Sequence, residues 1–169
     1  MNKSQNLFLV GPMGAGKSAV GRQLARLMRM DFVDSDDEIE HRTGVDIPFI
    51  FEKEGEEGFR KREVKIIEEL SVRQGIVLAT GGGAVMDSRN RSYLGARGFV
   101  IYLHTTVEQQ LVRTKRGRNR PLLDNKDRKA VIVELMEIRD PLYREISDLI
   151  VKTDGRLVRE VAAEIRDTL

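Results

Sequence analysis

The sequence predicts an α/β protein in which a five-stranded parallel sheet is flanked by helices. Five strand-like segments alternate with stretches of helical periodicity or high helix propensity, which is the pattern of a parallel sheet with helices on both faces. The first strand-like segment leads into residues 11–18, GPMGAGKS, which match the phosphate-binding pattern G-x-x-x-x-G-K-[ST] in full. Because 169 residues are too few for two ordinary domains, we expect a single domain over residues 1–169.

The five strands are expected at Leu7–Val10, Asp31–Asp34, Ile76–Thr80, Phe99–His104 and Leu149–Lys152. After the first of them, Val20, Leu24, Leu27 and Met28 recur at helical spacing, which predicts a helix whose apolar face packs on the sheet. Ligands of parallel sheets bind at the carboxyl ends of the strands. The residues directly after each strand are therefore the first candidates for a site.

Two stretches depart from this alternation and are interpreted as insertions. The first, roughly residues 47–70, contains three phenylalanines followed by a charged helical pattern. The second, residues 113–128, is polar and basic and contains Gly117 and Pro121, as expected of a mobile loop over a site. Five of the eight residues from Arg113 to Arg120 are Lys or Arg, a concentration that either a bound polyphosphate or plain solvation would explain.

Composition argues against several classes of function. The net charge of +2 results from 29 basic and 27 acidic residues, and only 5% of the residues are aromatic, so nucleic-acid binding is not expected. The absence of cysteine excludes disulfides and thiolate metal sites and fits a reducing cytoplasm. The first apolar stretch ends after four residues, far short of a signal sequence or a spanning helix. We expect a cytoplasmic protein without a membrane or nucleic-acid partner.

The phosphate-binding motif predicts a nucleoside triphosphate ligand with Mg²⁺. Glycines allow backbone N–H groups to curl around phosphate oxygens, while Lys17 brings a positive charge to the β- and γ-phosphates and Ser18 offers a hydroxyl to Mg²⁺. Ala19 stands where many such loops carry a second hydroxyl that reaches the α-phosphate, so a small loss of affinity is expected. The residues expected to bind the nucleotide are Gly14, Ala15, Gly16, Lys17, Ser18 and Ala19.

Carboxylates follow the second strand in the segment Asp34-Ser35-Asp36. As local structure, the segment predicts a helix N-terminus in which Ser35 and Glu38 form a capping box. As a site, it lies at the carboxyl edge of the sheet, where carboxylates hold Mg²⁺-bound water or accept a proton from a hydroxyl nucleophile. Both interpretations are compatible.

A glycine triplet follows Thr80 at the end of the third strand, where a ligand can lie directly against the backbone, and its members are Gly81, Gly82 and Gly83. Two arginine-containing segments, residues 59–63 and 139–143, have the solvated helix face as their ordinary interpretation, and spacing alone does not change it. His41 and His104 are expected to be surface or structural residues because no matching metal ligands accompany them.

Six segments in this order, GPMGAGKS, DSD, GFRKRE, TGGG, RPLL and RDPLY, resemble shikimate kinase and span nearly the whole chain. The resemblance implies a P-loop kinase fold of the nucleoside-monophosphate-kinase type, with a substrate-binding insertion at about residues 35–70 and a lid at about residues 113–128. It implies transfer of the γ-phosphoryl group of ATP to the 3-hydroxyl of shikimate, with Mg²⁺, in the route to chorismate and the aromatic amino acids. We expect a monomer that binds ATP and shikimate.

The resemblance also implies roles for individual residues. Asp36 would hold the reacting hydroxyl as the candidate base, and Asp34 would reach Mg²⁺ through water. The groups implied to bind shikimate are Asp36, Arg60, Gly81, Gly82, Gly83 and Arg139, with Glu63 in support. Arg120 matches the lid arginine that reaches the phosphates and joins Asp36 and Lys17 as a catalytic residue. Arg113 and Arg156 fall near the positions that flank adenine.

Two other functions compete with this one. A kinase of the same fold acting on gluconate or on a nucleoside monophosphate would not need two arginines and a triple glycine for a small hydroxylated acid. A nucleotide-dependent switch would read guanine with N-K-x-D, but residues 125–128 miss this pattern because Arg128 stands in the aspartate position. Protein-kinase signatures are absent as well.

Overall fold

The computed structural model describes residues 5–115 and 127–169. In chain order its elements are β1 (Asn6–Val10), α1 (Lys17–Met28), β2 (Asp31–Asp34), α2 (Ser35–Thr43), α3 (Ile47–Leu70), β3 (Ile76–Ala79), the 3₁₀ turn η1 (Ala84–Met86), α4 (Ser88–Arg97), β4 (Gly98–His104), α5 (Val107–Thr114), α6 (Arg128–Ile146), β5 (Leu149–Lys152) and α7 (Val158–Thr168).

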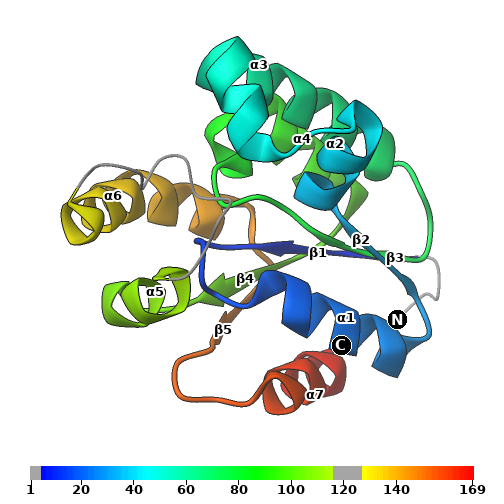
Figure 1. Cartoon of the computed structure of the whole chain (residues 1–169). Coiled ribbons are helices and arrows are strands. Elements are labelled where there is room, and N and C mark those ends of the chain that lie inside the picture. Colours follow the sequence, from blue (N-terminus) through cyan, green and yellow to red (C-terminus); the bar gives the residue numbers. More distant parts are fainter. Residues whose placement is uncertain (1–4, 116–126) are drawn as a thin grey trace.

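The five strands form one parallel sheet in the order β2-β3-β1-β4-β5 (Figure 1). The central strand β1 pairs with β3 on one side and with β4 on the other, so that Leu9 lies between Ala79 and Ile101. The predicted five-stranded parallel sheet is therefore confirmed. The bounds of β2 and β5 agree with the sequence-based expectation, whereas β1, β3 and β4 each differ from it by one residue.

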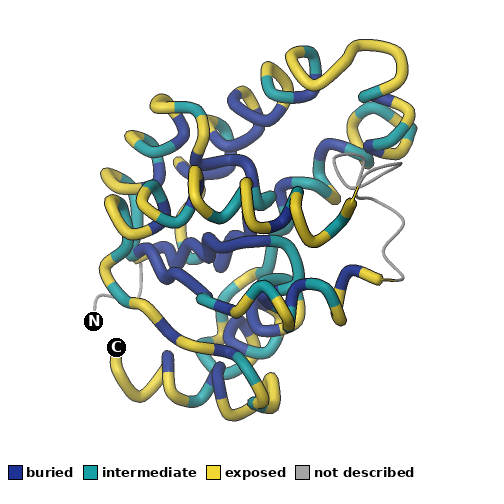
Figure 2. The backbone as a smooth tube through the Cα atoms, turned by 90° about the vertical axis from the view of Figure 1, so that its left-hand side faces the viewer, coloured by how far each residue is buried: buried dark blue, intermediate teal, exposed yellow. Residues whose placement is uncertain are grey.

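Side-chain alternation along the strands builds a core on each face of the sheet. Leu7 and Leu9 point to the face covered by α1 and α7, while Phe8 and Val10 point to the face covered by α3, α4 and α6. Figure 2 shows the strands as a buried band between partly exposed helices. Because both faces are covered, the strands are nearly continuously apolar, and the polar groups of the site are confined to the ends of the strands.

The helices α2 and α3 stand above the carboxyl ends of β2 and β3 and pack against each other (Figure 1). The carboxylate of Glu40 in α2 accepts a hydrogen bond from the backbone N–H of Ile47, which fixes the start of α3. The helix is interrupted at Gly55, whose φ of 72° is left-handed and suits glycine. The second half of α3 then carries Arg60 and Glu63 toward the sheet, because Phe59 and Ile67 anchor the same segment in the core.

The predicted capping box of Ser35 and Glu38 is wrong. Helix α2 begins at Ser35 itself, so the N-cap is Asp34, whose Oδ1 accepts hydrogen bonds from the backbone N–H groups of Asp36 and Asp37. The buried Ser35 hydroxyl instead accepts a hydrogen bond from the N–H of Gly81. Pairing of β2 with β3 decides this, because it brings the glycine turn next to Ser35 and makes a tertiary bond available.

Among residues 5–115 and 127–169, none of the helices combines the length and the apolar character that crossing a bilayer requires.

Candidate active site

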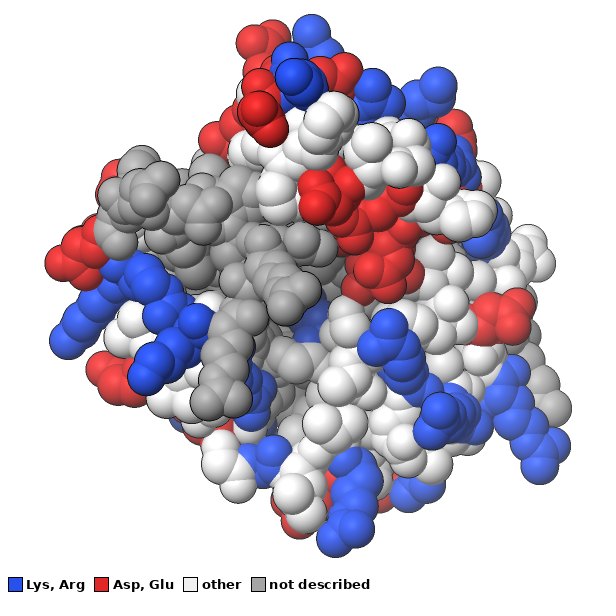
Figure 3. Space-filling model, viewed as in Figure 1, with Lys and Arg blue, Asp and Glu red and all other residues white. Residues whose placement is uncertain are grey.

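A pocket of about 370 Å³ opens at the carboxyl edge of the sheet, between α1, α2 and the turn after β3; we call it the central pocket. Among the sequence-predicted site residues, those that line it are Gly14, Gly16, Lys17, Ser18, Ala19, Asp34, Asp36, Gly81, Gly82 and Arg113. Figure 3 shows acidic side chains gathered over α2 on this side of the molecule, with basic side chains lying below them.

The phosphate loop connects β1 to α1, and the Lys17 side chain binds its backbone carbonyls. Gly16 forms the N-cap of α1 with a φ of 89°, a conformation that side chains rarely adopt. The Lys17 ammonium lies 2.7 Å from the carbonyl oxygen of Gly11 and 2.9 Å from that of Pro12. The loop thus presents a lysine and a helix N-terminus at one point of the pocket, which is the arrangement that binds phosphate.

Ser18 and Asp34 meet across this pocket. The Ser18 hydroxyl donates to Oδ2 of Asp34 over 2.5 Å, while Oδ1 of Asp34 caps α2. A hydroxyl and a carboxylate oxygen suit Mg²⁺, which keeps several waters and needs few protein ligands when phosphates are bound. No cluster of three or more His, Asp or Glu able to cage a metal exists in the part of the chain that the structure describes. The donor set therefore fits a Mg²⁺ ion held jointly with nucleotide, and does not fit a metal held by protein alone.

Asp36 lines the pocket with an unusual carboxyl group. Its Oδ1 is enclosed and has no hydrogen-bond partner among the described residues. Burial, together with the neighbouring carboxylates of Glu63 and Asp34, raises the pKa of Asp36 to about 7, although Lys17 and Arg60 oppose the rise. A carboxyl group poised near neutral pH in a pocket is suited to accepting a proton.

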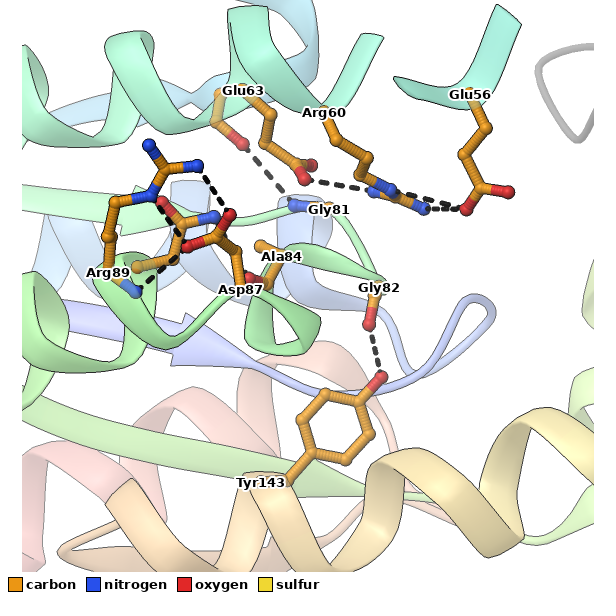
Figure 4. Close-up of polar contacts among 11 residues, drawn as sticks. Glu56, Arg60, Glu63, Gly81, Gly82, Ala84, Asp87, Arg89 and Tyr143 are labelled. Carbon is orange, nitrogen blue, oxygen red and sulfur yellow. Dashed lines mark hydrogen bonds and ion pairs between the residues drawn. The ribbon is translucent and has the colours of Figure 1, made fainter. Parts of the chain in front are cut away.

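Arg60 and Glu63 project from the second half of α3 onto the glycine turn (Figure 4). Nη1 of Arg60 donates to Oε1 of Glu63 over 2.9 Å, and Nη2 lies 3.3 Å from Oε1 of Glu56. Glu63 is only 1% exposed, and burial raises the pKa of its carboxyl group while Arg60 opposes that rise. Arg60 thus pairs with the buried carboxylate of Glu63 on one side and with the exposed carboxylate of Glu56 on the solvent side.

The glycine triplet lies against three charged side chains. A Cβ at Gly81 would stand 2.9 Å from Oδ1 of Asp36, and one at Gly83 would stand 2.7 Å from Cζ of Arg60. A Cβ at Gly82 would lie 3.5 Å from Nη1 of Arg139. None of the three glycines has a positive φ, so what a side chain would meet here is the charged groups beside Gly81 and Gly83 and the phosphate-loop backbone beside Gly82.

Arg139 comes from α6 and is 4% exposed. Its Nε has no hydrogen-bond partner within the described residues, and the same holds for Oε2 of Glu63. Arg60, Arg139 and Gly83 are not among the residues that line the central pocket; both arginines contact it through the glycine turn. The turn therefore joins two arginines and a carboxylate that are widely separated in the sequence.

A second cavity of about 330 Å³, which we call the side pocket, lies between α1 and α7 and is mainly apolar. Arg113 and Arg156 both line it. Arg113 donates to the carbonyl oxygen of Gly14 over 3.0 Å, and Arg156 is paired with Glu164. Because Gly16, Ala19 and Arg113 line both pockets, the side pocket continues the central one. Arg120, together with most of the predicted lid, lies outside the described residues.

Comparison with known proteins agrees with this geometry. The family model described as shikimate kinase matches residues 13–169. The shikimate kinase of Pasteurella multocida (strain Pm70) is 57% identical over 100% of this chain and 97% of its own length. That of Shewanella frigidimarina (strain NCIMB 400) is 56% identical, over 100% of this chain and 99% of its own. The chain belongs to the shikimate kinase family.

Comparison with solved structures agrees as well. A shikimate kinase from Acinetobacter baumannii in complex with shikimate superposes with a TM-score of 0.96, at 51% identity over 98% of this chain and 92% of the other. A gluconokinase from Sinorhizobium meliloti 1021 reaches a TM-score of 0.59 at 17% identity, over 97% of this chain and 90% of the other, which shows the fold alone. The predictions of the fold and of a shikimate kinase, a phosphotransferase that uses ATP, are confirmed.

The structure adds site features of this shikimate kinase that sequence reasoning missed. Asp37, Glu40 and Ile47 line the central pocket, and Glu56 holds Arg60. Tyr143 contacts the glycine turn, although the segment 139–143 predicts a role for Arg139 alone. The run of acidic residues after Asp34 is a local signal for Asp37 and Glu40, whereas nothing local marks Ile47, Glu56 or Tyr143.

Ala19 offers a test of the nucleotide site in this shikimate kinase. It is exposed and lies where the two pockets join, so the α-phosphate would pass beside it. We expect Ala19→Thr to lower the KM for ATP by about two- to tenfold, since one hydrogen bond contributes about 0.5–1.5 kcal/mol. The control is Ala19→Val, because valine has the shape of threonine without the hydroxyl; it should not lower the KM for ATP. Equal KM values in the two variants would contradict a missing phosphate contact.

Proposed function

We propose that this chain transfers the γ-phosphoryl group of ATP to the 3-hydroxyl of shikimate, with the nucleotide bound across the two pockets and shikimate bound against the glycine turn. The observation that carries the proposal is the convergence of Asp36, Arg60 and Arg139 on the glycine turn, beside the phosphate loop. A small hydroxylated acid needs a cation for its carboxylate and an acceptor for its hydroxyl proton. Both are present here within one site.

The nucleotide would lie across both pockets. The side pocket would hold adenine between Arg113 and Arg156, and the loop residues Gly14–Ala19 would bind the phosphates. Ser18, with Asp34 acting through water, would hold Mg²⁺, which when bound neutralises charge on the phosphates. Arg120, outside the described residues, would add positive charge to the transferring group.

Shikimate would lie against the glycine turn. Its carboxylate would bind Arg60 and Arg139, whose planar forks match a carboxylate, while Glu63 orients Arg60. Asp36 would take the proton from the 3-hydroxyl as that oxygen bonds to the γ-phosphorus and the bond to the β-phosphate oxygen breaks, releasing ADP. Lys17 would stabilise charge on the phosphoryl oxygens.

The remaining proposals concern organisation and location. Residues 35–70 would act as the substrate-binding insertion and residues 113–128 as the lid of a single domain, and the protein would act as a monomer. The lack of cysteine and the modest net charge support a cytoplasmic protein without nucleic-acid or membrane partners.

The function is tested by measuring ADP release from ATP and Mg²⁺ with shikimate, gluconate or AMP added in turn, and by identifying the product by mass. Of the three acceptors, we expect only shikimate to support ADP release, and we expect its product to carry one additional phosphate. Equal ADP release without an acceptor, or faster release with gluconate, would refute the proposal.

Glu56 leads to a further prediction about this site. Its carboxylate is half exposed and occupies the Arg60 fork that the substrate carboxylate would take. We expect Glu56→Gln to lower the KM for shikimate by up to about fivefold, because an exposed ion pair contributes about 0.2–1 kcal/mol. The control is Glu57→Gln, since Glu57 is 86% exposed and faces Lys61. A raised KM in Glu56→Gln would mean that Glu56 orients Arg60 for binding.

A further inference from the structure

Tyr143 is a fully buried residue at the border between the core and the site. It lies one helical turn after Arg139 on α6, and its ring packs in the apolar cluster beside Tyr102, with ring centroids 4.9 Å apart. Its hydroxyl leaves this cluster and donates a hydrogen bond to the carbonyl oxygen of Gly82 (Figure 4). Arg139 lies at the same glycine, with Nη1 3.5 Å from where a Cβ of Gly82 would stand.

A phenol at this position requires an explanation beyond packing. Phenylalanine would fill the same space, and burying a hydroxyl is unfavourable unless it is hydrogen-bonded. The partner of this hydroxyl is a residue of the pocket wall. Tyr102 shows the alternative, because its hydroxyl donates over 2.6 Å to Asp140, a residue that does not line the central pocket.

The bond reaches the middle glycine of the turn, whose carbonyl accepts no backbone N–H group from the turn that follows. The carbonyls of Gly81 and Gly83 accept backbone N–H groups from Ala84 and Met86 in the turn that follows. The Gly82 carbonyl is instead held by Tyr143. Three consecutive glycines have wide backbone freedom, so a single bond at the middle one restricts the whole turn.

The position of Gly82 matters because it separates two parts of the site. A Cβ at Gly82 would stand 3.3 Å from the backbone nitrogen of Met13 in the phosphate loop and 3.5 Å from Nη1 of Arg139. Movement of Gly82 would therefore change the space between the phosphate loop and the arginine. Tyr143 and Arg139 share one face of α6, so the same helix sets both the arginine and the turn that it faces.

We propose that Tyr143 is a positioning residue for the acid-binding half of the site: by holding the Gly82 carbonyl it fixes the glycine turn against Arg139 before substrate arrives. Its side chain is fully buried and lines neither pocket, so it acts through the turn. The inference rests on the proposed function for its kinetic consequence, and on the ligand-free structure alone for its effect on the turn.

The test compares Tyr143→Phe with Tyr102→Phe, two changes that each remove one hydroxyl from the same ring pair. Amide hydrogen exchange over residues 81–86 is measured first, without ligands. We expect at least threefold faster exchange in Tyr143→Phe and no change in Tyr102→Phe. Unchanged exchange in Tyr143→Phe, or equal acceleration in both variants, would overturn the proposal whatever the protein phosphorylates.

Steady-state kinetics provide the second measurement. For Tyr143→Phe we expect the KM for shikimate to rise about three- to tenfold, with the KM for ATP within about twofold of wild type. Tyr102→Phe should leave the KM values for shikimate and for ATP within about twofold of wild type, even if its melting temperature falls. An unchanged KM for shikimate in Tyr143→Phe would refute the positioning role. Wild-type protein that does not phosphorylate shikimate would refute the proposed function instead, and the exchange result would still decide the role of Tyr143.

Discussion

Replacing Asp36 by Asn is expected to lower kcat by roughly 10²–10⁴-fold, the usual scale for loss of a general base. The amide keeps the size of the side chain but accepts no proton and carries no charge. The wild-type carboxyl lines the pocket with its Oδ1 enclosed, and burial and neighbouring carboxylates raise its pKa to about 7, so it is suited to accept the proton of a hydroxyl nucleophile. Turnover is measured at saturating ATP and shikimate, with shikimate binding measured separately by calorimetry.

The control for this experiment is Asp37→Asn. Asp37 is the next residue, lines the same pocket and is exposed, with Arg22 3.8 Å away. We expect its kcat to remain within about threefold of wild type. If Asp36→Asn binds shikimate normally and turns over at nearly the wild-type rate, Asp36 only positions the hydroxyl, as a loose phosphoryl-transfer transition state would permit.

Replacing Arg139 by Ala is expected to raise the KM for shikimate by about 10- to 150-fold and to leave the KM for ATP nearly unchanged. A hydrogen bond to a charged group contributes about 1.5–3 kcal/mol, and the guanidinium is buried beside the glycine turn. Arg139→Lys should have an intermediate effect, since it keeps the charge but loses the planar fork. Arg60→Ala should act in the same direction.

Arg144 on the same helix is the matched control. Its side chain is 50% exposed and pairs with Asp140, so Arg144→Ala should leave both KM values unchanged. Melting temperatures of both variants show whether α6 remains folded. An equal rise in the KM values for ATP and shikimate in Arg139→Ala would show that Arg139 does not belong to a carboxylate clamp.

Features carried by neighbouring residues could be predicted from the sequence. The phosphate loop is a run of eight residues, and the alternation of strands and helices gave each strand to within one residue. Local chemistry determines both, because a left-handed glycine, a helix N-terminus and side-chain periodicity depend on nearby positions. The order of the six motifs predicted the family, and the family resemblance implied the roles of Asp36, Arg60 and Arg139.

Only the tertiary structure decided which groups meet. The capping box failed because pairing of β2 with β3 gives the Ser35 hydroxyl a partner in Gly81, and Asp34 then caps the helix. Arg60 and Arg139, whose roles spacing alone leaves open, lie at the same glycine turn because α3 and α6 both pack on one face of the sheet. Sequence determines what each residue can bind, but the partners of a buried side chain depend on the packing of elements far apart in the chain.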